Sequence, residues 1–104
     1  MQRGEIWWAE LPKPVGRRPV LILSRNRAVQ VREYVTTAEI TRTVRRIPTE
    51  VPLGPEDGLP KHCVANLDVI NTIPKKLLRE NITSLNPTQL QAVEAAMKFA
   101  LDLP

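Results

Sequence analysis

The sequence predicts a mainly β domain with one helix: a small curled sheet or barrel of about six short strands, capped by the helix at the C-terminus. Two observations predict this fold. Several short apolar runs, rich in β-branched and aromatic residues, alternate with segments that contain Pro, Gly or charged residues. The last part of the chain instead repeats apolar residues at helical spacing. At 104 residues the chain can bury a single modest core, so we expect one domain over residues 1–104.

Positive charge is concentrated in the N-terminal half. Residues 1–50 hold ten Lys and Arg against five Asp and Glu, whereas residues 51–104 hold five against six. Nine of the ten N-terminal cations are arginine, the residue that binds phosphate in a bidentate way. We therefore expect nucleic acid or another polyanion as the partner. The lone Cys63 excludes an internal disulfide and no long apolar run is present, so we expect a cytoplasmic protein that does not enter a membrane.

The first predicted strand covers residues 5–11 and carries the adjacent tryptophans Trp7 and Trp8. Neighbouring side chains on a strand point to opposite faces, so the two rings cannot enter the same core of a simple sheet. One interpretation is that one tryptophan faces a cleft or a partner. The other is that both are packed, because a curled sheet under a helix can be covered on both faces.

A basic turn leads into the second predicted strand, residues 18–23. Gly16 permits backbone angles that turns often require, and Pro19 lacks an N–H and therefore suits the start of a strand. Arg17 and Arg18 consequently lie at the rim of a rigid element. Their planar guanidinium groups either bind phosphate oxygens there or are simply solvated.

Further short strands follow, separated by polar or turn-rich segments. We place these strands at residues 34–41, 49–53, 63–66 and 68–73. The segment 42–46 is too basic for a core and is expected to be a charged loop or edge. Residues 54–60 contain two glycines and two prolines and are expected to connect strands as a turn-rich loop.

The C-terminal helix has the clearest local signals. Asn86 is an N-cap, Pro87 fits the first helical position, and Gln89 completes a variant of the capping box. Leu85 and Leu90 have the spacing of a hydrophobic staple. We therefore expect this helix to run from residue 87 to about 101. Before it we expect a short helical turn at residues 74–80 and a brief extended segment at residues 82–85.

Most of the circumference of the predicted helix is apolar. One face combines Leu90, Val93, Met97, Ala100 and Leu101. Beyond a narrow polar stripe of Gln91, Glu94, Lys98 and Asp102, a second apolar arc combines Ala92, Ala96, Phe99 and Leu103. This arc is wider than packing on one sheet requires. Either it contacts something else, such as another subunit, or the C-terminal tail covers Phe99.

The sequence lacks the residue patterns of several kinds of active site. A single histidine, His62, stands next to the single cysteine, which is a poor start for a zinc site and for a Cys-His nucleophile. Neither a nucleophile elbow nor a phosphate-binding Gly-rich loop is present. We therefore expect neither a metal nor a cofactor.

Arginine and hydroxyl side chains remain as candidates for chemistry. If the second and third strands are antiparallel neighbours, Arg18 at the start of one comes close to Thr41 at the end of the other, and the two can bracket a phosphate. RNA carries its own nucleophile, the 2′-hydroxyl. An enzyme then needs only to orient that group, neutralise the charge that develops on phosphorus and assist the leaving oxygen.

At several points in order the chain resembles the MazF/PemK (Kid-like) toxins of bacterial toxin–antitoxin pairs. The similar segments are residues 3–11, with Arg-Gly-Glu before the first strand, residues 16–24, with Arg-Pro before four apolar residues, residues 38–41, which end in Ile-Thr, and residues 69–73. The resemblance implies an SH3-like barrel, a homodimer and a metal-independent, sequence-selective endoribonuclease that acts on single-stranded RNA. In such enzymes the 2′-hydroxyl attacks and leaves a 2′,3′-cyclic phosphate and a 5′-hydroxyl.

The resemblance also implies roles for individual residues. Arg18 takes the place of the family's catalytic arginine and Thr41 that of its catalytic threonine. Arginine is a poor general base, so we assign Arg18 to charge stabilisation and to proton donation to the leaving oxygen, and Thr41 to hydrogen bonding of the phosphoryl oxygens. The general base stays unassigned. RNA binding is assigned to Lys13, Arg17, Arg42, Asp68 and Asn71.

The loop before Arg18 is shorter than in many relatives, and Asn71 stands where several relatives carry an arginine. A short loop suggests an open groove that also admits structured RNA, such as tRNA or rRNA loops. The resemblance further implies a cognate antitoxin whose disordered acidic tail competes for the basic groove. Two other functions stay open: a toxin of the same fold that binds a protein such as DNA gyrase, and a nucleic-acid-binding barrel without activity.

Overall fold

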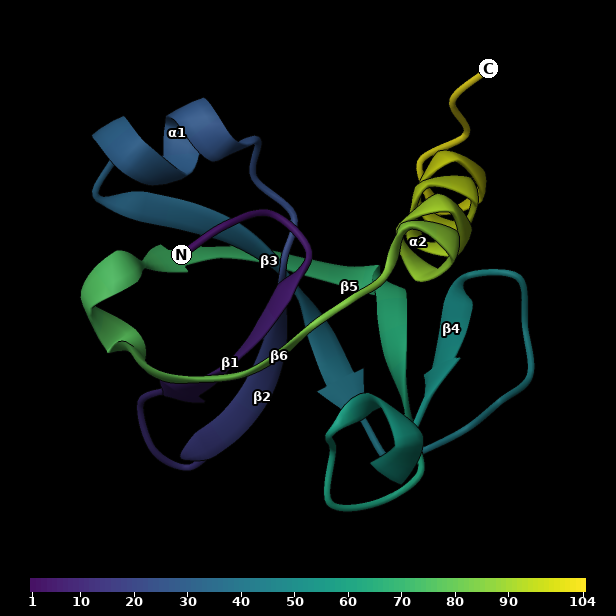
Figure 1. The fold of residues 1–104 in the computed structure, drawn as a ribbon, viewed down its shortest axis with the longest axis horizontal. Helices are drawn as coiled ribbons and strands as arrows, with labels where there is room; N and C mark the ends of the chain where they lie inside the picture. The colour runs from purple at the N-terminus through teal and green to yellow at the C-terminus, as the bar shows by residue number, and fades with distance from the viewer.

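Six antiparallel strands form one curled sheet, a half-barrel, in the computed structural model, which describes residues 1–104 (Figure 1). Their order across the sheet is β4-β5-β3-β2-β1-β6. The strands are β1 (Glu5–Glu10), β2 (Arg17–Ile22), β3 (Tyr34–Thr41), β4 (Glu50–Leu53), β5 (Cys63–Pro74) and β6 (Leu78–Ser84). The predicted fold class is confirmed, although β4 and β6 are free edges of the sheet rather than partners that close a barrel.

The two strands predicted at residues 63–66 and 68–73 are one long strand, β5. The prediction divided β5 because its pairing with β3 is interrupted: Glu39 lies opposite Asn66, whereas the preceding Ala38 lies opposite Ile70. The extra residues between Asn66 and Ile70 form a bulge, which has no simple local signature. The helical turn predicted at 74–80 is correct only for Lys75–Leu77, since β6 already begins at Leu78.

A short helix, α1 (Asn26–Val31), was not predicted. Its six residues are too few to show a helical period, and its N-cap residue, Arg25, makes no side-chain capping bond. Tertiary packing holds it instead, because Ala28 and Val29 are buried. The polar segment after β2 therefore contains a short packed helix.

The second half of β2, residues 20–22, is apolar throughout because alternate side chains enter two separate cores. Leu21 belongs to the larger core, which α2 covers with Val93 and Ala96. Val20 and Ile22 belong to a smaller core on the other face, together with Val29 of α1. Burial on both faces fixes the position of β2 firmly relative to its neighbours.

The C-terminal helix α2 (Pro87–Ala100) begins as predicted. The Asn86 side chain accepts a hydrogen bond from the Gln89 N–H at 2.8 Å, and the Gln89 side chain accepts one from the Asn86 N–H at 2.9 Å. The predicted faces of the helix are wrong at two residues. Ala96, which was predicted on the second apolar arc, is buried in the core, and Leu101, which was predicted on the first face, is 53% exposed. Phe99 is 63% exposed, so the C-terminal tail does not cover it. No helix in the structure is long and apolar enough to span a membrane.

Candidate functional site

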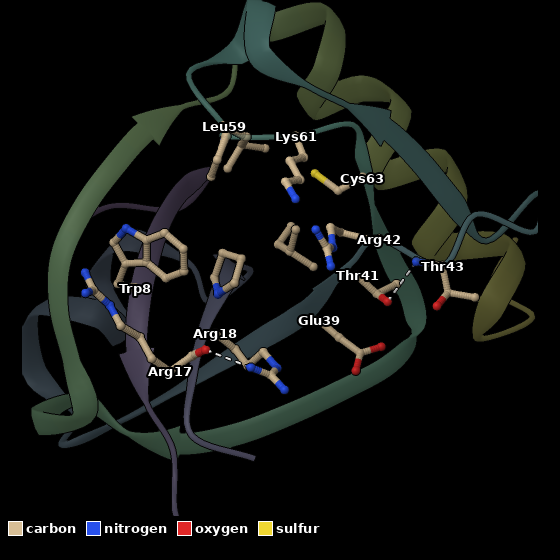
Figure 2. A pocket seen from close by; sticks show the side chains of 13 residues that line it. Trp8, Arg17, Arg18, Glu39, Thr41, Arg42, Thr43, Leu59, Lys61 and Cys63 are labelled. Carbon is tan, nitrogen blue, oxygen red and sulfur yellow. Dashed lines mark hydrogen bonds between the residues drawn. The ribbon is translucent and has the colours of Figure 1, made fainter.

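A groove of about 650 Å³ opens beside the ends of β2 and β3 (Figure 2). Its walls come from β1, β2, β3, the residues that follow β3, and the segment that leads from β4 into the start of β5. The lining residues are Trp8, Arg17, Arg18, Pro19, Glu39, Ile40, Thr41, Arg42, Thr43, Leu59, Pro60, Lys61 and Cys63. We refer to this set as the groove.

The groove exists because β2 and β3 part. The two strands pair only between Val20–Ile22 and Thr37–Glu39, although both continue further towards the groove. The register of this ladder, extended by two residues, would set Arg18 opposite Thr41. Figure 2 shows the two side chains on the sides of the opening that β2 and β3 form. The prediction that Arg18 and Thr41 flank the same space is therefore confirmed.

Arg18 and Thr41 both have hydrogen-bond donors that no group of the protein accepts. Arg18 is exposed and donates one hydrogen bond, from Nη1 to the Arg17 carbonyl at 3.0 Å, with no carboxylate in ion-pair contact. Its remaining N–H groups are free for a ligand. The Thr41 hydroxyl accepts a hydrogen bond from the Thr43 N–H at 3.2 Å, so its own proton is free to be donated. The pair can offer converging donors to an anion.

One tryptophan faces the groove and the other does not. Trp8 lines the groove, with the Arg17 guanidinium 4.6 Å from the centre of its ring. Arg17 also pairs with Glu80 across 3.3 Å at the exposed rim. Trp7 packs against the smaller core instead. The interpretation in which a single tryptophan faces a cleft is therefore correct.

The groove is strongly cationic. Arg17, Arg18, Arg42 and Lys61 all line it, against the single carboxylate of Glu39. In Figure 2 the labelled cations Arg17, Arg18, Arg42 and Lys61 lie around the opening. Such an arrangement attracts a polyanion and raises its local concentration.

Cys63 forms part of the wall of the groove but is not poised as a nucleophile. Its free thiol is buried. Burial raises the pKa of Cys63, and the nearby carboxylates of Asp57 and Glu56 raise it further, so the thiolate is disfavoured. His62 is exposed and does not line the groove. No three His, Cys, Asp or Glu side chains gather into a set that could hold a metal ion.

Three of the residues assigned to RNA binding lie outside the groove. Lys13 is exposed on the turn between β1 and β2. Asp68 accepts a hydrogen bond from the Thr49 hydroxyl at 2.6 Å and so secures the bulge of β5. Asn71 pairs with Thr37 within the sheet. Contacts of these three residues with RNA stay predictions, whereas Arg17 and Arg42 do line the groove.

The sequence analysis missed two charged residues of the groove. Glu39 precedes Thr41 by two residues, so strand alternation alone places both side chains on one face. Strand alternation could therefore have predicted Glu39 as a residue of the groove. Lys61 comes from the loop before β5, and its approach to β3 depends on the path of the loop, which no local pattern encodes.

A sequence model of the family described as "PemK-like, MazF-like toxin of type II toxin-antitoxin system" matches residues 2–101. Among individual relatives, the "Probable endoribonuclease MazF5" of Mycobacterium tuberculosis is 34% identical over 101 residues, which cover 96% of this chain and 92% of that protein. The "Probable endoribonuclease MazF2" of the same species is 40% identical over 91 residues, which cover 86% of this chain and 87% of that protein.

Solved structures are similar over the same length. The toxin MazF-mt6 of Mycobacterium tuberculosis superposes with a TM-score of 0.89 at 38% identity and covers 96% of this chain and 98% of its own. An endoribonuclease solved in complex with its cognate antitoxin, from a mycobacterial species, superposes with a TM-score of 0.87 at 31% identity and covers 100% and 97%, respectively.

Proposed function

The chain belongs to the PemK-like, MazF-like family of toxins of type II toxin–antitoxin systems, and we propose that it cleaves single-stranded RNA in the groove. The MazF5 and MazF2 relatives are named probable endoribonucleases and the mycobacterial complex contains an endoribonuclease, and endoribonuclease activity is assigned to this chain on that basis. The observation that carries the location of the activity is the pair Arg18 and Thr41, which flank one cationic groove with unused donors.

The proposed reaction is transesterification by the substrate's own 2′-hydroxyl. Arg18 binds the scissile phosphate and stabilises the charge that develops on its oxygens, and Thr41 donates a hydrogen bond to one of them. The 2′-oxygen attacks phosphorus, the bond to the 5′-oxygen breaks, and the products are a 2′,3′-cyclic phosphate and a 5′-hydroxyl. Arg18 also donates a hydrogen bond to the leaving oxygen. None of these roles requires a metal ion.

The other groove residues fit a single strand of RNA. Arg17 and Arg42 are placed to neutralise flanking phosphates, and the Trp8 ring offers a surface on which a base can stack. The side chains of all three are at least partly exposed. An open groove of this kind also accepts the unpaired loops of folded RNA. We further propose that a longer RNA strand extends beyond the groove and contacts Lys13, Asp68 and Asn71.

A cognate antitoxin is the expected protein partner, as in the mycobacterial complex. We propose that a disordered acidic tail of this antitoxin occupies the groove, because carboxylates can pair with the same arginines that bind RNA phosphates. A homodimer is also proposed, with the exposed apolar side chains Phe99, Leu101 and Leu103 at the end of α2 as the candidate contact.

The test is cleavage of a long single-stranded RNA in EDTA by the purified protein, with both ends of every fragment mapped. We expect discrete cuts with 5′-hydroxyl and 2′,3′-cyclic phosphate ends, and none at a nucleotide whose 2′-hydroxyl is replaced by hydrogen. Arg18→Ala is expected to stop cleavage. Arg27→Ala is the matched control, because it removes an exposed arginine of α1 outside the groove.

Cleavage by folded Arg18→Ala protein at the wild-type rate would refute the assignment of the groove. If the wild-type protein cuts no RNA, including tRNA and rRNA, the toxin that binds a protein target such as DNA gyrase becomes the better function. The exposed apolar end of α2 is the surface that would serve it.

A further inference from the structure

The proposed reaction needs a group that removes the proton of the 2′-hydroxyl, and the groove offers few. Guanidinium groups cannot act as bases, and an ammonium group already carries its proton. The Cys63 thiol is buried and disfavoured as a thiolate. Threonine hydroxyls are far weaker bases than carboxylates. Glu39 is the one remaining side chain of the groove with the chemistry of a general base.

Glu39 lies on the face of β3 that also carries Thr41. Its neighbours in the ladder are Val20 of β2 and Asn66 of β5. Val20 and Arg18 are two residues apart on β2, so they too share a face. Glu39 therefore occupies the last rung before β2 and β3 part, adjacent to the two residues proposed to hold the phosphate. Figure 2 shows its carboxylate at the edge of the same opening as Arg18 and Thr41.

The carboxylate of Glu39 has no structural partner. It is exposed, makes no hydrogen bond to the protein and forms no ion pair, although four cations line the same groove. The contrast with Glu50 is informative, because one Glu50 side-chain oxygen accepts hydrogen bonds from the backbone N–H groups of Arg45 and Arg46, each at 2.9 Å. Glu50 organises its loop, whereas nothing in the fold uses the Glu39 carboxylate.

We propose that Glu39 is the general base of the cleavage reaction, an inference that rests on the proposed ribonuclease function. The carboxylate takes the proton of the 2′-hydroxyl as the bond from the 2′-oxygen to phosphorus forms. The bond to the 5′-oxygen breaks, and that oxygen keeps the bonding electron pair and takes a proton from water. The protonated Glu39 returns its proton to solvent through the open groove, so the enzyme is regenerated and no redox partner is needed.

A catalytic carboxylate in an RNA groove has a recognisable cost. The Glu39 carboxylate repels the phosphates that the surrounding arginines attract, so its charge opposes RNA binding in the groove. Removal of its charge should therefore slow the chemical step without weakening RNA binding. A residue that merely shaped the groove would show the opposite pattern.

The test measures single-turnover cleavage and RNA affinity for the wild type, Glu39→Gln and Glu33→Gln. Glu33 is the matched control, since it is an exposed glutamate next to the far end of β3 and outside the groove. We expect Glu39→Gln to lose about a hundredfold or more in cleavage rate, within the range that general base catalysis contributes. Its RNA affinity should equal or exceed that of the wild type, and Glu33→Gln should match the wild type in both measurements.

Chemical rescue provides a second, independent readout. In Glu39→Ala the missing side chain leaves room for a small carboxylate ion. Added formate should therefore restore part of the cleavage rate, whereas chloride at equal ionic strength should not. Arg18→Ala should not respond to formate. This specificity separates a missing base from a disturbed groove.

The outcomes separate the two proposals. Wild-type protein that cleaves no RNA overturns the proposed function, and the role of Glu39 with it. Wild-type cleavage together with an unchanged rate in Glu39→Gln overturns only the role of Glu39. A loss of rate that is matched by an equal loss of affinity, without rescue by formate, also overturns it, because Glu39 would then act in binding alone.

Discussion

The two ends of the β2–β3 pair differ sharply, although they belong to the same two strands. At one end the strands are hydrogen-bonded, and Leu21, Ile22 and Thr37 are almost completely buried. At the other end the ladder stops at the pair Val20 and Glu39, and Arg17, Arg18 and Glu39 are exposed. The buried end supplies stability, and the parted end supplies unpaired groups that are held at fixed positions. Function and stability should therefore be separable by substitutions only a few residues apart.

Leu21→Ala should have the largest effect, and it should fall on stability. Leu21 is fully buried in the larger core, so its truncation removes buried apolar surface and leaves a cavity. We expect a loss of about 2–5 kcal/mol in the free energy of unfolding. Urea denaturation followed by tryptophan fluorescence measures it. A loss below 1 kcal/mol would mean that the paired end is less tightly packed than its burial indicates.

Thr41→Val should reduce activity and leave the fold nearly unchanged. The substitution keeps the shape of the side chain but removes the hydroxyl proposed to donate to a phosphoryl oxygen. A hydrogen bond to a charged group contributes about 1.5–3 kcal/mol, so we expect a rate of cleavage about ten- to a hundredfold lower. Cleavage at a fixed site in a short RNA measures it, with Thr43→Val, a threonine also in the wall of the groove, as the comparison. Equal losses in both variants would speak against a specific role of Thr41.

Trp8→Ala should weaken RNA binding. Its ring lines the groove under the Arg17 guanidinium, where a base can stack on the exposed part of the ring. Loss of one stacked base costs about 1–3 kcal/mol of binding free energy. Fluorescence titration of a 2′-deoxy oligonucleotide, which binds without being cut, measures it. Trp7→Phe is the control, because Trp7 packs on the smaller core, and an equal loss there would show that Trp8 has no special part in binding.

Glu80→Gln should have the smallest effect on stability. Arg17 and Glu80 form an ion pair in which both side chains are exposed, Arg17 by 52% and Glu80 by 68%. Pairs of this kind contribute less than about 1 kcal/mol. Release of Arg17 should instead strengthen RNA binding slightly, because its charge is no longer shared. Weaker RNA binding in this variant would show that the pair holds Arg17 in its productive position.

The sequence predicted well what local signals encode. The capping residues Asn86 and Gln89 predicted the start of α2 correctly, because the capping bonds join residues close in sequence. Strand adjacency likewise predicted that Arg18 and Thr41 flank one site. In the bulge of β5, Asp68 is hydrogen-bonded to Thr49, 19 residues away, and no local pattern reveals such a contact.

The site was predicted only in part, because some of its residues are placed by contacts between segments that are distant in the sequence. Residues on the strands were accessible to reasoning from alternation, and Glu39 could have been placed beside Thr41 in that way. Lys61 reaches the groove through a loop whose course depends on packing between distant segments. The short helix α1 is held by tertiary contacts of Ala28 and Val29, so its six residues gave no periodic signal.

The two free edges of the sheet bear on how the protein behaves at high concentration. An unprotected strand edge recruits other strands and leads to aggregation. The β4 edge is only four residues long and contains Pro52, which has no N–H to donate. The β6 edge presents the exposed polar side chains Arg79, Glu80 and Asn81. Both edges therefore discourage the addition of strands from other chains.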